Sequence, residues 1–329
     1  MATTLDIIRR PIEEDIERFN EFVRENFREE QGTLLGDMLD YVLGSRGKGL
    51  RPIVVMLAAG ANSSVGTFGK RTMLAAMLVE MIHVASLIHD DVIDESNLRR
   101  GQASVNARWQ SRNAVIVGDY ILARNMSIGL QSGQYDMLSH IIGTMSSLCE
   151  GELVQSDHAG KLDTTRNDYL DIIYKKTASL FAVSASVGAM SVGAPREQVE
   201  NMHRFGAALG MAFQIVDDIL DYEPTGNTGK PAANDLRERK ITLPLIEAME
   251  LASAEEREKV LRHIEQCAES AESIEAVHRF VEKYDGVARA RNCVQAYLQR
   301  AMSYVAKCSE TPYRESLLAL CSFVAERDK

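Results

Sequence analysis

The chain has 329 residues, of which 45% are hydrophobic and 26% charged. That is ample for a large core and slightly beyond the usual limit of one domain, about 250 to 300 residues. A net charge of −10 disfavours nucleic acid, because phosphate backbones bind basic surfaces. No linker rich in proline, glycine or serine divides the chain, so we expect a single domain over residues 1–329.

The cysteines indicate the cellular compartment. Their number is odd and no Cys-x-x-Cys occurs, the five being Cys149, Cys267, Cys293, Cys308 and Cys321. This pattern favours reduced thiols in a cytoplasmic protein over a disulfide framework or a zinc site. The N-terminus lacks the apolar stretch of a signal peptide, and we expect no transmembrane segment, since none of the unbroken apolar runs reaches about 18 residues.

The first part of the chain is helical and leads into a basic segment. Apolar residues recur at helical spacing over residues 4–28, and a short helix is expected over 34–44. The segment Ser45-Arg46-Gly47-Lys48-Gly49-Leu50-Arg51-Pro52 follows. Its glycines allow close backbone approach to a ligand, and Lys48 and Arg51 would lie at a helix start that favours anions. The alternative is a plain basic loop; the spacing is not that of a P-loop.

A long apolar helix from about Met73 ends in an acidic cluster, His89-Asp90-Asp91-Val92-Ile93-Asp94-Glu95. On a helix, Asp90 and Asp94 lie one turn apart on the same face, with Asp91 beside them. Acids are favoured at the opposite end of a helix, so a hard cation such as Mg²⁺ between them would explain the pattern. The alternative is a solvated acidic helix end.

Basic side chains accompany this cluster. His83 lies on the same helical face as Asp90, and Arg99-Arg100-Gly101 follows the acids. Because guanidinium groups match phosphate oxygens, we predict phosphate contacts for all three basic residues. The alternatives are a core or surface histidine and a solvated basic turn.

The middle of the chain continues with helices over about 113–130 and 135–158. Thr165 with Asp168 resembles a capping box that starts the next helix. That helix carries Lys176 and Thr177 among apolar residues. A buried lysine is costly unless it is paired, so a diphosphate partner is plausible for Lys176.

A second acidic cluster, Gln214-Ile215-Val216-Asp217-Asp218-Ile219-Leu220-Asp221, ends an apolar helix that begins near Phe205. Residues 223–234 then form the one long loop, which carries Lys230, and Lys240 follows. The remainder reads as helices, one of them opened by a Ser253–Glu256 capping box. No strand-like alternation of useful length occurs, and the fold class is therefore expected to be all-α.

Together the two acidic patterns predict a chemistry. They could face each other across one cavity and hold several Mg²⁺ ions around a diphosphate, with the basic residues between them. No Ser–His–Asp or Cys–His pair offers a covalent nucleophile, and the apolar helix walls suit a hydrocarbon tail. Metal-assisted ionisation of an allylic diphosphate is one reaction that uses this combination.

The sequence resembles the all-trans polyprenyl (isoprenyl) diphosphate synthase family. The resemblance lies in motifs that occur in family order: Gly47-Lys48-Gly49-Leu50-Arg51-Pro52, Leu87-Ile88-His89-Asp90-Asp91-Val92-Ile93-Asp94, Arg99-Arg100-Gly101, Lys176-Thr177, Phe213-Gln214, Asp217-Asp218-Ile219-Leu220-Asp221 and Gly229-Lys230. It implies a single large helical bundle around a central cavity. It also implies a homodimer, with transient membrane contact for product release.

The resemblance also implies residue roles. Asp90, Asp94 and Asp217 would ligate Mg²⁺, supported by Asp91, Asp218 and Asp221. Arg99, Lys176 and Lys230 would hold the allylic diphosphate, and Lys48, Arg51, His83 and Arg100 would bind isopentenyl diphosphate. Lys176, Thr177 and Gln214 would face the carbocation, and Lys240 would support the site. One position departs from the family pattern, because Ala233 stands where the loop usually has its second glycine.

Product length is expected to depend on the wall of the first acidic helix. Ala85 and Ser86, one turn before Asp90, are small, whereas short-chain relatives carry a bulky aromatic residue there. Further back, Ile82 and Val79 are moderate in size. The pattern resembles medium- to long-chain synthases of the octaprenyl type, and the alternative is a short-chain farnesyl or geranylgeranyl diphosphate synthase.

Three other classes of protein are considered. A non-catalytic partner subunit of the same fold would usually lose one acidic cluster, and this chain keeps both. A terpene cyclase needs no isopentenyl diphosphate site, which the segment with Lys48 and Arg51 would provide. A purely structural bundle would leave the basic motifs unexplained.

Overall fold

The computed structural model describes residues 4–45, 47–63, 68–222 and 233–327. Lys230 and most of the long loop expected over 223–234 lie outside the described residues. The chain divides into two compact units. The first comprises Met1–Met145, Val183–His203 and Ala306–Leu317, and the second comprises Ser146–Ala182, Arg204–Val305 and Leu318–Lys329.

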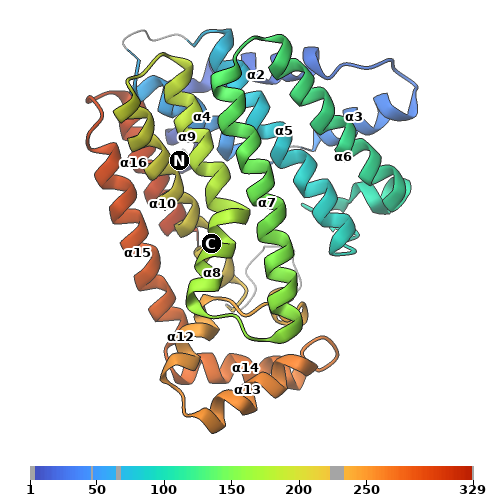
Figure 1. The fold of residues 1–329 in the computed structure, drawn as a ribbon, viewed down its shortest axis with the longest axis vertical. Coiled ribbons are helices and arrows are strands. Elements are labelled where there is room, and N and C mark those ends of the chain that lie inside the picture. The colour runs from blue at the N-terminus through green and yellow to red at the C-terminus, as the bar shows by residue number, and fades with distance from the viewer. Residues whose placement is uncertain (1–3, 46, 64–67, 223–232, 328–329) are drawn as a thin grey trace. The chain divides into compact units, whose positions relative to one another are not determined.

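Helices dominate the first unit (Figure 1). Its elements are α1 (Thr4–Arg9), the 3₁₀ helix η1 (Arg10–Ile12), α2 (Glu13–Asn26), α3 (Leu34–Gly44), α4 (Leu50–Ala61), α5 (Lys70–Ile93), β1 (Leu98–Arg99), β2 (Gln102–Ala103) and α6 (Val105–Gln131). The all-α prediction is confirmed, since the strands of the described part are one two-residue antiparallel pair.

Helix α5 is the core of the first unit. It packs against α2, α4 and α6, and Figure 1 shows it beside α6. Among the described residues, α5 is the one helix that is long and apolar enough to cross a membrane by length and composition. The criterion of an unbroken apolar run, applied to the sequence, did not select it. Because 72% of that apolar window is buried inside the protein, α5 has the character of a core helix.

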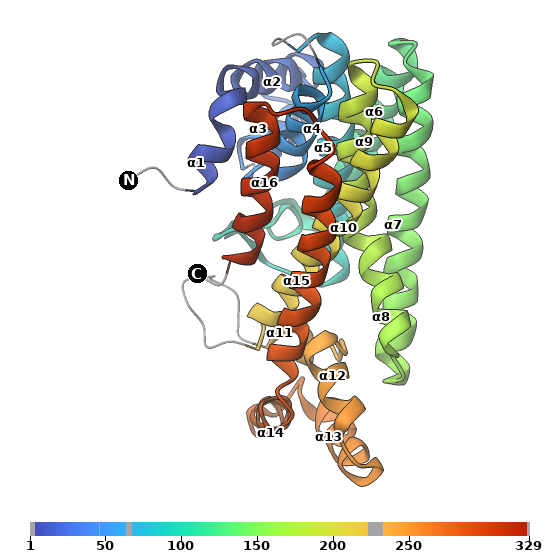
Figure 2. The same ribbon diagram turned by 90° about the vertical axis from the view of Figure 1, so that its left-hand side faces the viewer.

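The second unit contains the remaining whole elements. They are α8 (Arg166–Ile173), the π-helix η2 (Tyr174–Ala178), α11 (Asn234–Arg237), α12 (Leu243–Leu251), α13 (Ala254–Gln266), α14 (Ala271–Lys283) and α15 (Gly286–Val305). Helix α12 packs on α15, and α13 packs beside α14 (Figure 2). A Cβ at Gly286 would lie 2.2 Å from the carbonyl oxygen of Pro244, so glycine permits the close approach of α12 and α15.

Four helices contribute residues to both units: α7 (Tyr135–Lys161), α9 (Ser179–Ser191), α10 (Arg196–Leu220) and α16 (Pro312–Ala325). The expected helix starts are partly confirmed. Capping boxes occur at Thr165 and Ser253 as predicted. Helix α6, in contrast, starts at Val105 and not near residue 113, and Gln110 breaks it with a φ of 71°. A local non-helical residue of this kind leaves no mark in the apolar spacing.

Candidate active site

The first acidic cluster lies at the C-terminal end of α5. Asp94 follows the last helical residue, and its backbone N–H donates to the Asp90 carbonyl at 2.8 Å. The negative end of a helix dipole disfavours carboxylates, so Asp90 and Asp94 occupy a place where a bound cation would relieve repulsion.

Asp91, the middle acid, is bound to Arg99. Its carboxylate is 3% exposed. Arg99 Nε donates to both carboxylate oxygens, at 2.8 and 2.7 Å, and Nη2 lies 2.6 Å from Oδ1. An ion pair with several bonds holds a guanidinium in one orientation. Asp91 therefore fixes the orientation of the Arg99 guanidinium through Nε and Nη2.

A tight hairpin carries the adjacent arginines. Arg100 and Gly101 connect β1 to β2, with φ values of 54° and 76°. Positive φ at both central residues is the backbone of a type I′ turn, an unusual conformation for arginine. The hairpin is tied down by the Tyr41 hydroxyl, which donates to the Ala103 carbonyl at 2.6 Å. From the sequence, phosphate contacts were predicted for Arg99 and Arg100, with a solvated basic turn as the alternative, but the strands beside them were not predicted.

A basic pocket lies beside Asp91 within the first unit. It is lined by residues of α3, α5 and the hairpin, among them Ser45, Glu80, His83, Arg99 and Arg100. Arg100 Nη1 donates to the Ser45 carbonyl at 3.0 Å. A Cβ at Gly47 would lie 2.4 Å from Arg100 Cζ, so the glycine of the basic segment makes room for this guanidinium.

The charges of this pocket change the titration of its members. Burial, then the charges of Arg51, Arg100 and Arg99, lower the pKa of His83 well below its ordinary value. Burial and the charge of Arg99 lower the pKa of Arg100 as well. Both shifts have the sign expected where cations crowd together, and an anion such as a diphosphate would relieve them.

The basic segment begins α4. Gly49 precedes the helix with a φ of 61°, a left-handed conformation that glycine adopts readily. The backbone carbonyl of Lys48 accepts a hydrogen bond from Arg9, and Arg51 lies in the first turn of the helix. As predicted, Lys48 and Arg51 flank a helix N-terminus, where backbone N–H groups favour anions.

The residues expected to line the product path lie on α5, and most of them face the interior of the protein. Val79 and Ala85 are fully buried and Ile82 nearly so. Ser86 is partly buried, and its hydroxyl donates to the His83 carbonyl at 2.9 Å. The small side chains at 85 and 86 leave this wall without an aromatic ring one turn before Asp90.

The second acidic cluster ends α10, in the second unit. Asp217 forms an ion pair with Arg327, with Nη1 2.8 Å from Oδ1. The Arg327 guanidinium also lies over the ring of Phe213, 4.2 Å from its centroid. A cation thus already lies beside Asp217. The sequence contained no local signal for this contact between residues so far apart.

Asp218, the middle acid of this cluster, is 4% exposed and points inward. The Tyr169 hydroxyl donates to its Oδ2 at 2.6 Å, and Gln214 Nε2 donates to its Oδ1 at 2.8 Å. Burial raises the pKa of Asp218 well above its ordinary value, and these two hydrogen bonds oppose the rise. The predicted site residues did not include Tyr169.

Asp221 caps a short helix. Its two carboxylate oxygens accept hydrogen bonds from the backbone N–H groups of Asn234 and Asp235, each at 3.0 Å. Just before them, Ala233 is buried with a φ of 62°. This is the left-handed conformation in which a glycine carries no penalty and an alanine does, which accounts for the glycine that the family usually has there.

A π-helix displays the predicted cation-facing residues. The stretch Tyr174–Ala178 forms η2, and single π-turns often mark functional sites. Lys176 pairs with Glu152 and donates to Gln155, and the Thr177 hydroxyl donates to Gln214 Oε1 at 2.6 Å. Lys176 thus has protein partners, which the argument from its burial did not foresee.

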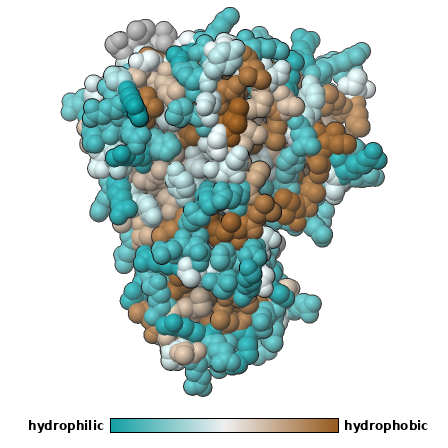
Figure 3. Space-filling model, viewed as in Figure 1, coloured by the Kyte–Doolittle hydropathy of each residue, from teal (hydrophilic) through white to brown (hydrophobic). Residues whose placement is uncertain are grey.

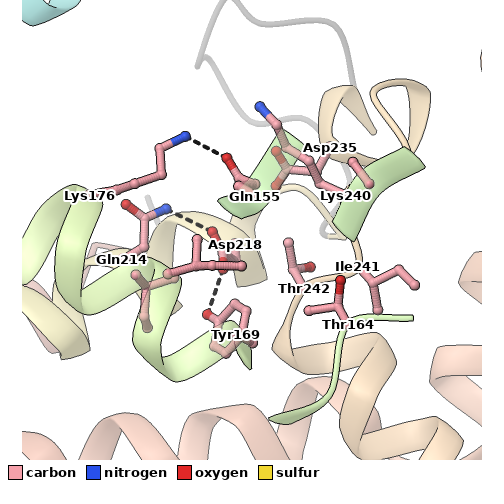
Figure 4. Close-up of a pocket in the computed structure, with 13 residues that line it drawn as sticks. Gln155, Thr164, Tyr169, Lys176, Gln214, Asp218, Asp235, Lys240, Ile241 and Thr242 are labelled. Atoms are coloured by element: carbon pink, nitrogen blue, oxygen red, sulfur yellow. Dashed lines mark hydrogen bonds between the residues drawn. The ribbon is translucent and has the colours of Figure 1, made fainter. Parts of the chain in front are cut away.

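One pocket of the second unit contains Lys176, Gln214 and Asp218 in its lining (Figure 4). Its lining is formed by Gln155, Ala159, Thr164, Tyr169, Ile172, Ile173, Lys176, Gln214, Asp218, Asp235, Lys240, Ile241 and Thr242. Lys240 also pairs with Glu238. Figure 4 shows hydrogen bonds from Tyr169 and Gln214 converging on Asp218.

Both clusters have the chemistry of a hard-cation site. The donors are carboxylate oxygens at helix C-terminal ends, the type of ligand that Mg²⁺ and Ca²⁺ prefer. Within the described ranges, no group of three or more His, Cys, Asp or Glu side chains forms a ready metal site. The residues therefore fit an ion that takes one or two carboxylates and completes its shell with phosphate oxygens and water.

Comparison with known proteins defines the family. The family described as "Polyprenyl synthetase" matches residues 32–281, and the chain belongs to it. The octaprenyl diphosphate synthase of Haemophilus influenzae is 32% identical over 326 residues, covering 99% of this chain and 98% of that protein. A decaprenyl diphosphate synthase from Rhodobacter capsulatus has a solved structure with a TM-score of 0.91 and 34% identity, covering 99% of both chains.

A further solved relative is the polyprenyl synthase of Caulobacter crescentus, complexed with calcium and isoprenyl diphosphate. It is 29% identical with a TM-score of 0.90, covering 99% of this chain and 98% of that one. The predictions of family, fold and enzyme class are thus confirmed: the protein is a prenyltransferase of the polyprenyl diphosphate synthase type. The family condenses isopentenyl diphosphate with allylic diphosphates and uses a divalent metal.

Proposed function

We propose that this protein elongates an allylic diphosphate with isopentenyl diphosphate, using Mg²⁺, to an all-trans product of medium or long chain. One observation carries the proposal. Asp91, which lies between Asp90 and Asp94 at the end of α5, lines a pocket together with His83, Arg99 and Arg100. A hard-cation site next to an anion site is what a metal-bridged diphosphate requires.

We assign the substrate groups as follows. Isopentenyl diphosphate is bound by Lys48, Arg51, His83 and Arg100, and the allylic diphosphate by Arg99, Lys176 and Lys230. The metal is held by Asp90, Asp94 and Asp217, and Lys240 supports the site. Asp91, Asp218 and Asp221 act indirectly. The support for this last assignment is that each of the three orients a neighbouring part of the protein: Asp91 holds Arg99, Asp218 bonds Tyr169 and Gln214, and Asp221 caps a short helix.

The side chains then divide the chemical work. The metal, when bound, neutralises the leaving diphosphate. Arg99, fixed by Asp91, orients the allylic diphosphate, and the oxygen dipoles of Thr177 and Gln214 stabilise the developing carbocation. The released diphosphate accepts the proton after the carbon–carbon bond has formed.

The proposed product length rests on the α5 wall. Ala85 and Ser86 are small, and Ile82 and Val79 are of moderate size, so a tail passing Asp90 meets no ring in the first turns. The relatives named octaprenyl and decaprenyl diphosphate synthases also favour a long product. A relative named short chain isoprenyl diphosphate synthase is 30% identical, and short-chain synthesis is therefore the alternative that the assay decides.

The test is incubation with farnesyl diphosphate, labelled isopentenyl diphosphate and Mg²⁺, with the products sized by chromatography. We expect all-trans chains longer than geranylgeranyl diphosphate, and shorter products from Ala85→Tyr, which places a ring in the path. Product that stops at geranylgeranyl diphosphate in the unaltered enzyme would refute the long-chain assignment. Absence of any elongation would refute the function.

We also propose a homodimer. Exposed apolar side chains gather over α6 and the beginning of α7, where Figure 3 shows apolar surface. They are Val115, Ile116, Leu130, Tyr135 and Ile142. Apolar patches of this kind mark protein interfaces. Light scattering at micromolar concentration should give the mass of a dimer, and the mass of a monomer would contradict the proposal.

The remaining proposals concern domain organisation, cellular location and membrane contact. We propose that residues 1–329 act as a single domain; the match of solved relatives over 99% of their length supports this. We propose a cytoplasmic location, which the odd number of cysteines without a paired motif favours. Release of a long apolar product into a bilayer calls for transient membrane contact. Fractionation of cells and flotation of the product-loaded enzyme with vesicles test the last two.

A further inference from the structure

A chain of four hydrogen-bonding groups begins in the pocket of the second unit, with Tyr169, Asp218 and Gln214 in its lining, and ends at Thr177. The Tyr169 hydroxyl and Gln214 Nε2 both donate to Asp218, at 2.6 and 2.8 Å, and the Thr177 hydroxyl donates to Gln214 Oε1 at 2.6 Å. Tyr169 is 3% exposed and Asp218 is 4% exposed. Water therefore has little access to the bond between Tyr169 and Asp218, and the protein sets the geometry of this end of the chain.

All donors of this chain run toward Asp218. Gln214 Nε2 donates to Asp218 Oδ1 at 2.8 Å, so the NH₂ end of the Gln214 amide lies on the Asp218 side. The amide oxygen must then face Thr177, whose one hydroxyl proton it accepts. Gln214 Oε1 and Thr177 Oγ1 each keep lone-pair capacity beyond the bond they share.

The role of Tyr169 follows from its position. A carboxylate with one firm partner can rotate, and its oxygens then no longer match a fixed amide. Tyr169 holds Oδ2 at 2.6 Å, which leaves Oδ1 for Gln214. If the amide turned over, its N–H groups would face Thr177 and any positive charge beside it, and that arrangement is repulsive.

We infer that Tyr169 is a positioning residue which, through Asp218, fixes the Gln214 amide with its oxygen toward Thr177, so that oxygen lone pairs face the allylic carbocation. This inference rests on the proposed function, since it needs a carbocation in the pocket. It assigns Asp218 to orientation of the amide, whereas the sequence pattern placed it in support of the metal.

The experiment is a rapid-quench measurement of one condensation, with bound farnesyl diphosphate, labelled isopentenyl diphosphate and Mg²⁺. A single turnover excludes product release from the rate. Tyr169→Phe removes one hydroxyl that bonds a charged group, and we expect the rate to fall by about ten- to a hundredfold. The matched control is Tyr222→Phe, another buried hydroxyl of the same unit whose contact, with Thr242 Oγ1, is long at 3.5 Å.

A double-mutant cycle separates positioning from packing. If Tyr169 acts through Gln214, Tyr169→Phe should add less than about twofold to the loss caused by Gln214→Leu. Losses that multiply, or a Tyr169→Phe rate within about twofold of the Tyr222→Phe rate, would overturn the inference.

A second variant tests the inference even if Tyr169→Phe fails to fold. Asp218→Asn keeps the shape but replaces one acceptor oxygen by a donor, and it should slow the reaction and likewise be non-additive with Gln214→Leu. Full activity of Asp218→Asn would overturn the inference. An unaltered enzyme that fails to condense the substrates at all would contradict the proposed function instead, so the two failures are distinguishable.

Discussion

The two acidic clusters share one sequence pattern but differ in how their middle aspartate is held. Asp91, in the first unit, is paired with the cation Arg99. Asp218, in the second, receives hydrogen bonds from the neutral groups of Tyr169 and Gln214. In both clusters the middle acid is buried and has protein partners. The central acid of each cluster therefore orients its neighbours, whereas we propose Asp90, Asp94 and Asp217 as the metal ligands.

The difference in partner indicates what each cluster orients. An ion pair beside Asp91 directs a guanidinium, which suits recognition of a diphosphate. A neutral network beside Asp218 directs an amide and a hydroxyl, which suits a site for positive charge. We therefore propose that Asp91 serves the recognition of an anion and Asp218 the stabilisation of a cation.

The largest expected effect is loss of the outer acids. Asp90→Ala and Asp217→Ala should each lower turnover by about a thousandfold or more, because a metal ligand is removed. Circular dichroism should remain that of the folded protein. The control Asp40→Ala changes an exposed acid of α3 and should retain full activity. Near-normal turnover of either variant would refute the metal assignment.

Removal of the charge of the middle aspartate should destabilise the protein more in the first cluster than in the second. Asp91→Asn breaks a buried ion pair, and we expect it to lower the free energy of unfolding by about 2 kcal/mol. This value is smaller than for a fully buried pair because Arg99 is partly exposed to solvent. Asp218→Asn also removes a costly buried charge, and the loss should be less than half as large. Urea denaturation measures both. Equal losses would contradict the distinction between charged and neutral partners.

The pH dependence should report the crowded cations of the first unit. The pKa of His83 is lowered well below 6.5 by burial and by Arg51, Arg100 and Arg99. The unfolded chain therefore binds this proton first, and stability falls as the pH drops below the ordinary value of about 6.5 toward the lowered one. His83→Gln should lessen that fall in urea titrations. The exposed residue His140 supplies the control His140→Gln, which should leave the fall unchanged.

The smallest effect concerns the backbone after the second cluster. Ala233 has a φ of 62°, and Ala233→Gly should raise the free energy of unfolding by about 1 kcal/mol. Ala288→Gly, at an exposed position of α15, should lower it by about 1 kcal/mol. Two changes of the same type with opposite signs isolate the conformational cause. A loss of stability in Ala233→Gly would contradict it.

Local patterns in the sequence predicted much of the fold. The apolar spacing before Asp90 predicted α5, and the Thr165–Asp168 and Ser253–Glu256 pairs predicted helix starts that the structure confirms. Such features depend on residues within one or two helical turns, which a sequence displays directly.

Other features depend on contacts between distant segments. The sequence placed Asp91 and Asp218 among the metal-supporting acids, but Tyr169 lies far from Asp218 along the chain, and the hairpin beside Arg99 and Arg100 consists of two-residue strands. The π-helix that displays Lys176 and Thr177 likewise depends on close approach at Gly151, where a Cβ would lie 2.9 Å from Lys176 Cγ. Tertiary packing, not periodicity, decides such details.

The central claim is that Asp90, Asp94 and Asp217 hold the metal while the middle acids, Asp91 and Asp218, orient side chains. Crystals grown with Mn²⁺ in place of Mg²⁺ and with an unreactive thio analogue of an allylic diphosphate test it most directly, through anomalous scattering from the metal. We expect metal peaks beside the carboxylates of Asp90 and Asp217, with Asp91 still paired to Arg99 and Asp218 still bonded to Tyr169. A metal ion coordinated by Asp91 or Asp218 would contradict the account.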